Sequence, residues 1–262
     1  MRKLGICLGG ATREDFQDRL ELAKTVGFEA AFPGIADRQT TNERCEALRT
    51  AGLAIDNLHA PFKGVNVMWE KGIEGDDFLA VQLENIDTCR DNGITKTVVH
   101  LGSGWDSPLI TEAGIARYDK LVDYAVGKGV RIAFENIRKL VHVAWAMDHY
   151  SKVPEVGFCW DSGHELCYTK NCEFLPIYGD RVICIHLHDN VGIPAADEHF
   201  LPFDGKRDWE KTAEYLKASA YNGPIMLEDN IRAPIYSRLT LEEYYARAYA
   251  AASKLRDMIE NS

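Results

Sequence analysis

The chain has 262 residues, 46% of them hydrophobic, and carries a formal net charge of −10 at pH 7. This composition is ordinary for a globular protein, and the length is enough to bury a large core without disulfide staples. The acidic balance disfavours broad nonspecific binding to nucleic acid. No stretch approaches the roughly 18 consecutive apolar residues that a transmembrane helix needs. The opening run MRKLGICLGG is too short in its apolar part for a signal peptide, so a cytoplasmic location is expected.

The seven cysteines are an odd number and form no Cys-x-x-Cys pair. Cys7, Cys159 and Cys184 fall inside apolar, strand-like runs, where a thiol behaves as a small hydrophobic group. Cys167 and Cys172 are close in sequence, but no second cluster completes a zinc knuckle. Cysteine usage therefore favours free thiols in a reducing compartment over a disulfide framework.

Strand-like and helix-like segments alternate from one end of the chain to the other. The expected strands are 4–8, 28–32, 54–59, 97–100, 130–135, 156–161, 182–188 and 225–228. The expected helices are 13–26, 41–51 with Thr41 or Asn42 as its cap, 76–91, 111–126, 208–219 and 241–259. Such apolar strands are typical of a parallel sheet covered on both faces.

Eight strands alternating with helices predict an α/β fold, a single (β/α)8 TIM barrel over residues 1–262, with its active site at the C-terminal ends of the strands. An open doubly wound sheet is the alternative. It is weakened because no Gly-x-Gly-x-x-Gly motif follows the first expected strand.

Four residues with metal-binding side chains end the fifth to eighth expected strands: Glu135, Asp161, His188 and Glu228. Neighbouring strand ends of a barrel meet at one mouth, so these side chains form a hard, anionic site suited to Mn²⁺, Mg²⁺, Co²⁺ or Zn²⁺. A carboxylate at such a turn often only caps the next helix, but four agreeing strand ends favour the metal. His186 faces the same side of its strand as His188. Either could be the ligand, and His188 is preferred because it is nearer the mouth.

A second set lies close to the same mouth. It comprises His59, His100, His164, Asp197 and His199. A lone histidine at a strand end is commonly a hydrogen-bonded structural residue. Here these residues are candidates for additional metal ligands or for substrate contacts.

The short motifs at the expected strand ends match a known family. They are His59-Ala-Pro, Val99-His100-Leu-Gly, Phe134-Glu135-Asn, Asp161-Ser-Gly-His164, His186-Leu-His188-Asp-Asn, Asp197-Glu-His199 and Leu227-Glu228. Over essentially its whole length the chain resembles the xylose-isomerase-like TIM-barrel superfamily of sugar (phosphate) isomerases, epimerases and endonuclease IV. The resemblance implies that Glu135, Asp161, His188 and Glu228 hold the metal. It also implies that Glu135 and Glu228 move the proton and that His164 contacts substrate.

The resemblance implies a metal-dependent sugar (phosphate) isomerase or epimerase that transfers a proton next to a carbonyl through an enediolate. A dehydratase of a keto-polyol, of the inosose or dehydroshikimate type, would use the same chemistry. A degenerate barrel that only binds a ligand is a further alternative, which the intact ligand set opposes.

The alternative from a different class is a trinuclear zinc phosphodiesterase acting at abasic DNA, like endonuclease IV. The resemblance implies three ligand sets, and all nine of their positions are filled. They are His59, His100 and Glu135 for the first ion; Glu135, Asp161, His188 and Glu228 for the second; and His164, Asp197 and His199 for the third. The acidic composition argues against it, because binding to a phosphate backbone draws on cationic contacts.

The expected partners are a small carbohydrate and a divalent metal ion (Zn, Mn, Mg or Co), without an organic cofactor, nucleic acid or membrane. Barrels often form homo-oligomers, and the sequence specifies no symmetry. Many sugar-isomerase-like members continue after Asp-x-His with a Pro-Gly-x-Gly turn, whereas this chain has Pro202-Phe203-Asp204-Gly205. Four aromatic residues of the expected top loops are candidates for the wall of a sugar pocket: Phe62, Trp69, Trp105 and Phe203.

Overall fold

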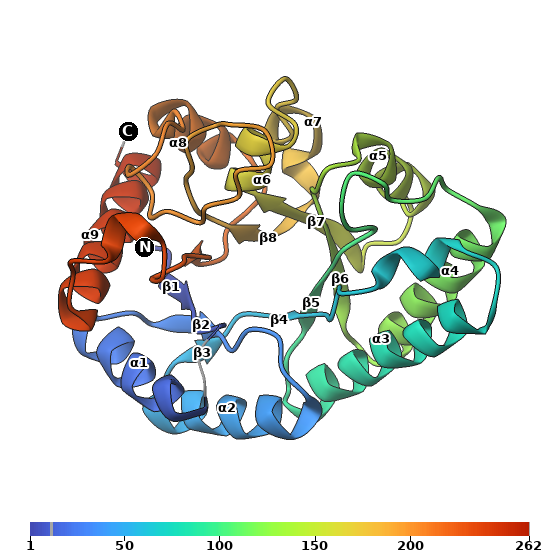
Figure 1. The fold of residues 1–262 in the computed structure, drawn as a ribbon, viewed down its shortest axis with the longest axis horizontal. Coiled ribbons are helices and arrows are strands. Elements are labelled where there is room, and N and C mark those ends of the chain that lie inside the picture. The colour runs from blue at the N-terminus through green and yellow to red at the C-terminus, as the bar shows by residue number, and fades with distance from the viewer. Residues whose placement is uncertain (11–12, 262) are drawn as a thin grey trace.

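The computed structural model describes residues 1–10 and 13–261 and shows a ring of parallel strands surrounded by helices (Figure 1). The strands are β1 (Leu4–Cys7), β2 (Ala30–Phe32), β3 (Ala54–Ile55), β4 (Leu58–His59), β5 (Lys96–Val99), β6 (Arg131–Glu135), β7 (Val156–Asp161), β8 (Val182–His186) and β9 (Ile225–Leu227). All their ladder pairings are parallel. The predicted α/β TIM-barrel fold is confirmed.

The strands pair in the order β3-β2-β1-β9 and in the order β4-β5-β6-β7-β8. The two sheets meet where Leu187, just after β8, bridges to Leu227 of β9. At the other seam, β3 and β4 are the two halves of the single strand expected at 54–59. Asp56 and Asn57 lie between them, and the Asp56 carboxylate is 2.8 Å from Lys96 Nζ. The single strand expected at 54–59 is thus two short strands, one in each sheet.

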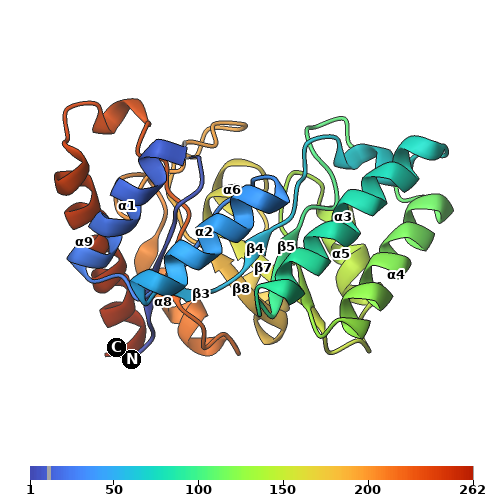
Figure 2. The same ribbon diagram turned by 90° about the horizontal axis from the view of Figure 1, so that it is seen from below.

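The helices lie outside the strands, and both termini lie at the same edge of the barrel (Figure 2). The helices are α1 (Arg13–Val26), α2 (Arg38–Ala51), α3 (Ile73–Asp91), α4 (Glu112–Gly127), α5 (Leu140–His149), α6 (Ser162–Cys167), α7 (Leu175–Tyr178), α8 (Trp209–Ala218) and α9 (Leu241–Glu260), with 3-10 turns at Val65–Trp69, Gly179–Arg181 and Pro234–Tyr236. Within the described residues, none of these helices combines the length and apolar character needed to cross a membrane.

Helix α2 begins earlier than the sequence pattern predicts. Asp37 is its cap, and its side chain accepts a hydrogen bond from Thr40 N at 2.9 Å. The expected cap, Thr41, lies inside the helix and is buried. Asp is as good a cap as Thr or Asn, so the capping residue could not be chosen from residue type alone.

The main core fills the space between the strands and the helices. A separate, small cluster of buried residues contains Val98, Ala133, Cys159 and Cys184, one from each of β5 to β8. Such small side chains leave room inside the barrel, and the larger polar side chains at the ends of the same strands extend above them.

Candidate metal centre

Three carboxylates and one imidazole gather at the C-terminal ends of neighbouring strands. Ligand atoms of Glu135, Asp161, His186 and Glu228 all lie within 4.8 Å of one another. They come from the last residues of β6, β7 and β8 and from the first residue after β9. We call this set the carboxylate group. It brings together three of the four residues that the sequence analysis expected to share a metal.

The fourth position in this group is filled by His186, whereas the sequence analysis preferred His188. Strand β8 ends at His186, and its Nδ1 lies 2.8 Å from Glu135 Oε1 and 3.0 Å from Glu228 Oε2. His188 follows the strand, and its Nε2 lies 3.0 Å from Asp161 Oδ1. His188 was preferred because it comes later in the chain and so nearer the mouth of the barrel. The side chain that reaches the two glutamates is instead that of His186, the last residue of β8.

Glu135 is fully buried and is surrounded by imidazoles. His100 Nε2 lies 2.5 Å from its Oε2, and His59 Nε2 lies 3.4 Å from the same oxygen. Burial by itself would raise the pKa of this carboxyl group, but His186 and His100 outweigh it and hold the pKa well below the usual range. An anionic Glu135 at neutral pH is the state that can bind a cation.

The donor set fits a divalent metal ion. The ion-pair partners found for Glu135 and Glu228 are all histidines, which can give up their protons to make way for a cation. Buried carboxylates are stable when they are paired or coordinate a metal. Two glutamates, one aspartate and one histidine offer the oxygen and nitrogen donors that Mg²⁺, Mn²⁺, Co²⁺ and Zn²⁺ accept.

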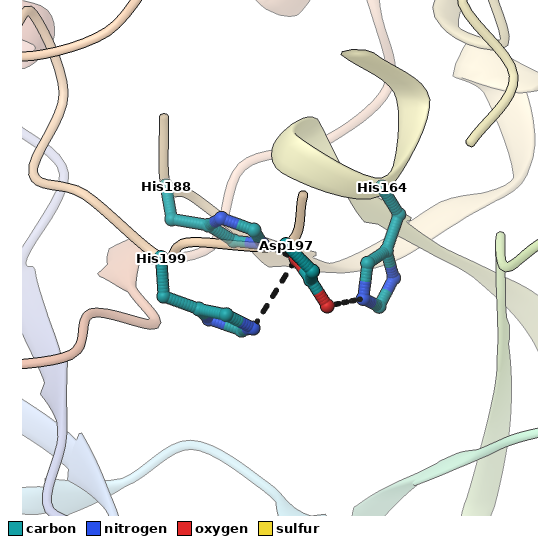
Figure 3. Close-up of side chains that lie close together, drawn as sticks. All are labelled: His164, His188, Asp197 and His199. Carbon is teal, nitrogen blue, oxygen red and sulfur yellow. Dashed lines mark ion pairs between the residues drawn. The ribbon is translucent and has the colours of Figure 1, made fainter. Parts of the chain in front are cut away.

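A second set adjoins the carboxylate group and is shown in Figure 3. Ligand atoms of His164, His188, Asp197 and His199 all lie within 4.8 Å of one another, and we call them the histidine group. Asp197 lies between two of the rings, with Oδ2 3.3 Å from His164 Nε2 and Oδ1 3.5 Å from His199 Nε2. The rings of His188 and His199 stack with their centroids 3.8 Å apart.

Mutual charge stabilisation dominates the histidine group. Burial opposes charge on His164, but Asp161 and Asp197 raise its pKa to about 10. Burial likewise opposes charge on His199, and Asp197 raises its pKa to about 9. The same two histidines outweigh burial and hold the pKa of Asp197 far below its usual range. Without a metal, the raised pKa values favour imidazolium at His164 and His199 on either side of the Asp197 carboxylate.

Local backbone geometry positions both groups. Asp161 Oδ1 accepts a hydrogen bond from His164 N at 2.6 Å and so caps α6, while Oδ2 of the same carboxylate lies 3.0 Å from His188 Nε2. Capping and metal binding, set against each other in the sequence analysis, are thus compatible for this residue. His199 has a left-handed backbone with φ of 50°, and its Nδ1 lies 2.8 Å from Glu228 O. Such strain is common where a loop must aim a functional side chain.

A cavity of about 330 Å³ opens beside the site. Glu228 and His199 line its polar side, and Phe32 and Phe62 line its apolar side. The Phe62 ring stacks on His100 with a centroid distance of 4.5 Å. Phe62 therefore lines a cavity beside the site, and its contact with a sugar stays a prediction.

The other three expected wall aromatics do not line this cavity. Trp69 is 1% exposed, and its indole packs on His142 in the helical shell. Trp105 is 48% exposed and meets Tyr168 edge to face. Phe203 packs against Trp209 near α8 and does not line the cavity.

Sequence reasoning overlooked a third set beneath the carboxylate group. The sulfur atoms of Cys159 and Cys184 and a ring nitrogen of His186 lie within 4.8 Å of one another. Both thiols are buried, as the apolar runs predicted. Their position two residues before Asp161 and His186 was the available signal, because residues two apart share a face of a strand.

Comparison with known proteins agrees with this fold. The sequence model of the family described as xylose isomerase-like TIM barrel matches residues 15–254. The chain belongs to this family. Two relatives are the uncharacterized protein y4fM of Sinorhizobium fredii, 35% identical over 163 residues, and the uncharacterized protein MJ1311 of Methanocaldococcus jannaschii, 27% identical over 150 residues. These matches cover 59% and 52% of this chain, and 50% and 49% of the relatives, so the chain spans about half the length of each.

Several solved structures share the fold at low sequence identity. A D-tagatose 3-epimerase-like protein has a TM-score of 0.75 at 17% identity, with 99% of this chain and 98% of that chain covered. The IOLI protein, solved with a binding zinc atom, has a TM-score of 0.76 at 18% identity with the same coverage. The 3-keto-D-glucoside 4-epimerase from E. coli has a TM-score of 0.73 at 15% identity, with 98% and 99% covered. At identities this low, the structural similarity shows a common fold and no more.

Proposed function

We propose that this protein is a divalent-metal-dependent isomerase or epimerase of a sugar or a related polyol ketone. The observation that carries the proposal is the carboxylate group, in which two glutamates, an aspartate and a histidine converge at the mouth of the barrel. The structural neighbours add support, since several are epimerases of ketoses or keto-sugars.

Glu135, Asp161, His186 and Glu228 would hold the metal ion, which is Zn²⁺, Mn²⁺, Mg²⁺ or Co²⁺. A divalent ion in this position supplies Lewis acidity, which acidifies the C–H bond next to a substrate carbonyl. The choice of His186 over His188 follows the distances to the two glutamates. It predicts that His186→Asn loses this metal and that His188→Asn keeps it, as measured by elemental analysis.

Two carboxylates are placed to move the proton. Glu135 ends β6 and Glu228 follows β9, so they approach the centre of the mouth from different sides and meet at His186 Nδ1. One glutamate removes the proton from the carbon next to the carbonyl, and the other returns a proton from the opposite face. His199 and Phe62 both line the cavity. His199 binds a substrate oxygen, and Phe62 excludes water.

Proton exchange tests the proposal directly. The metal-loaded protein is incubated in D₂O with a panel of ketoses and inososes, and loss of the C–H signal next to the carbonyl is followed by NMR. We expect exchange with at least one member and, with it, an epimer or isomer. A dehydrated product would reassign the protein to the keto-polyol dehydratases. Absence of exchange across the panel would refute an enediolate mechanism.

The histidine group supports a second candidate, a trinuclear zinc phosphodiesterase. Together with the set His59, Glu135 and His186, it supplies ligands beyond those that one metal needs. Metal stoichiometry separates the two functions, since about one ion per chain fits the isomerase and about three fit the phosphodiesterase. Incision of a duplex with an abasic site, in the presence of zinc, tests the second candidate.

A further inference from the structure

Two thiols lie directly beneath the carboxylate group. Cys159 of β7 and Cys184 of β8 are in-register partners, and two residues further along Asp161 and His186 are partners as well. Alternate residues of a strand face the same side, so each thiol lies one step below a residue of the carboxylate group. Both cysteines are 0% exposed. Their sulfur atoms lie within 4.8 Å of a ring nitrogen of His186.

The two ring nitrogens of His186 have very different surroundings. Nδ1 is 2.8 Å from Glu135 Oε1 and 3.0 Å from Glu228 Oε2. Nε2 is buried and has no hydrogen-bond partner among the described residues. When the lone pair of Nδ1 binds a metal, the neutral ring must carry its hydrogen on Nε2. A buried N–H without an acceptor is costly, and metal-binding histidines normally donate this hydrogen to an oxygen.

The surroundings of Cys184 orient its thiol. Asn57 Nδ2 donates a hydrogen bond to the sulfur at 3.5 Å, and the thiol lies 3.9 Å from Asp56 Oδ2, to which it donates. Asp56 is itself held by Lys96 at 2.8 Å. Because the thiol hydrogen is directed to Asp56, a lone pair of the sulfur is left to accept a further hydrogen bond.

We propose that Cys184 is a positioning residue for His186: its sulfur accepts the Nε2 hydrogen and so keeps Nδ1 directed at the metal. Cys159 packs against the same ring and completes the layer. The inference rests on the proposed metal centre and assigns a role to a thiol where such sites ordinarily use a carboxylate or a carbonyl. The Lys96–Asp56 pair at the base of the barrel is thereby connected, through Cys184, to the ligand set.

The test compares Cys184→Ala with Cys184→Ser, whose hydroxyl can still accept. Cys45→Ala is the matched control, because Cys45 is also 0% exposed but lies on α2. Zinc affinity is measured by competition with a chromophoric chelator. The Nε2–H signal of His186 is followed by ¹H–¹⁵N NMR of the zinc-loaded protein and assigned with His186→Asn. We expect Cys184→Ala to weaken zinc binding about 10- to 100-fold and to lose the protected Nε2–H signal.

Cys184→Ser should recover most of the affinity with a shifted Nε2–H signal, and Cys45→Ala should match wild type. Unchanged affinity and an unchanged signal in Cys184→Ala would overturn the positioning role, as would equal losses in Cys45→Ala. If Cys184→Ala does not fold, an unshifted signal in Cys184→Ser overturns it. Wild-type protein that takes up zinc but exchanges no substrate proton would refute the isomerase and leave the role of Cys184 standing.

Discussion

Replacing Glu228 with Gln separates proton transfer from folding more cleanly than any other change in the carboxylate group. Glu135 contacts several histidines at once, whereas the ion-pair partner found for the Glu228 side chain is His186, 3.0 Å from Oε2. The Gln side chain has the same shape, and its amide oxygen can still accept that hydrogen bond. The substitution removes the negative charge and the basic oxygen without changing the shape of the side chain. Because Glu228 is also a proposed metal ligand, metal content is measured on the same samples.

The magnitude follows from the roles assigned to Glu228. Loss of a general acid or base slows a reaction by about 10²- to 10⁴-fold, which corresponds to about 3 to 5 kcal/mol of transition-state free energy. The unfolding free energy should fall by about 1.5 to 3 kcal/mol, the range for a hydrogen bond to a charged group, which leaves the protein folded. Activity should therefore fall by far more than the change in stability can account for.

The assay is deuterium exchange at the carbon next to the substrate carbonyl, followed by NMR at saturating metal. Denaturant unfolding is measured on the same samples. Glu198→Gln is the control, because Glu198 lies in the loop between β8 and α8 and accepts a hydrogen bond from Val191 N at 2.8 Å without belonging to either ligand group. An exchange rate for Glu228→Gln within a few-fold of the control would show that Glu228 is not a proton-transfer group.

Three further predictions follow from the same structure. In metal-free protein, the pKa is raised to about 10 for His164 and to about 9 for His199, so protonation of these two rings should stabilise the fold. This stabilisation should be complete below pH 6.5, the ordinary histidine pKa, and should be lost as the pH rises through 9 to 10. Urea unfolding measured from about pH 6 to 10.5 checks it. Trp69→Ala should destabilise the fold by about 3 to 5 kcal/mol, because the Trp69 side chain is only 1% exposed and its removal leaves a cavity. The prediction would be contradicted if the urea midpoint shifted less for Trp69→Ala than for Trp105→Ala, which removes an exposed side chain. Gly163→Ala should disturb the histidine group, because the added methyl group would overlap the ring of His188; the histidine NMR signals report it, and an unperturbed spectrum would refute it.

Much of the site could be anticipated because the ends of parallel strands converge in any barrel. That rule predicted that Glu135, Asp161 and Glu228 would meet, and the structure brings them together with a histidine from β8. It could not decide between His186 and His188. Residues two apart in a strand point to the same side, so the sequence pattern treats the two histidines alike. Strand β8 ends at His186, and this end point determines which ring reaches the glutamates.

The sequence by itself determined the barrel, because its apolar runs and helical periodicities recur in a fixed alternation. It also determined that acids and histidines lie at the strand ends. The tertiary structure decided how they divide into a carboxylate group and a histidine group, because that depends on side chains from strands far apart in the sequence. It also decided that Cys184 lies beneath His186. A buried thiol in an apolar run looks like any small hydrophobic residue until the register of β7 with β8 places it next to a ring nitrogen.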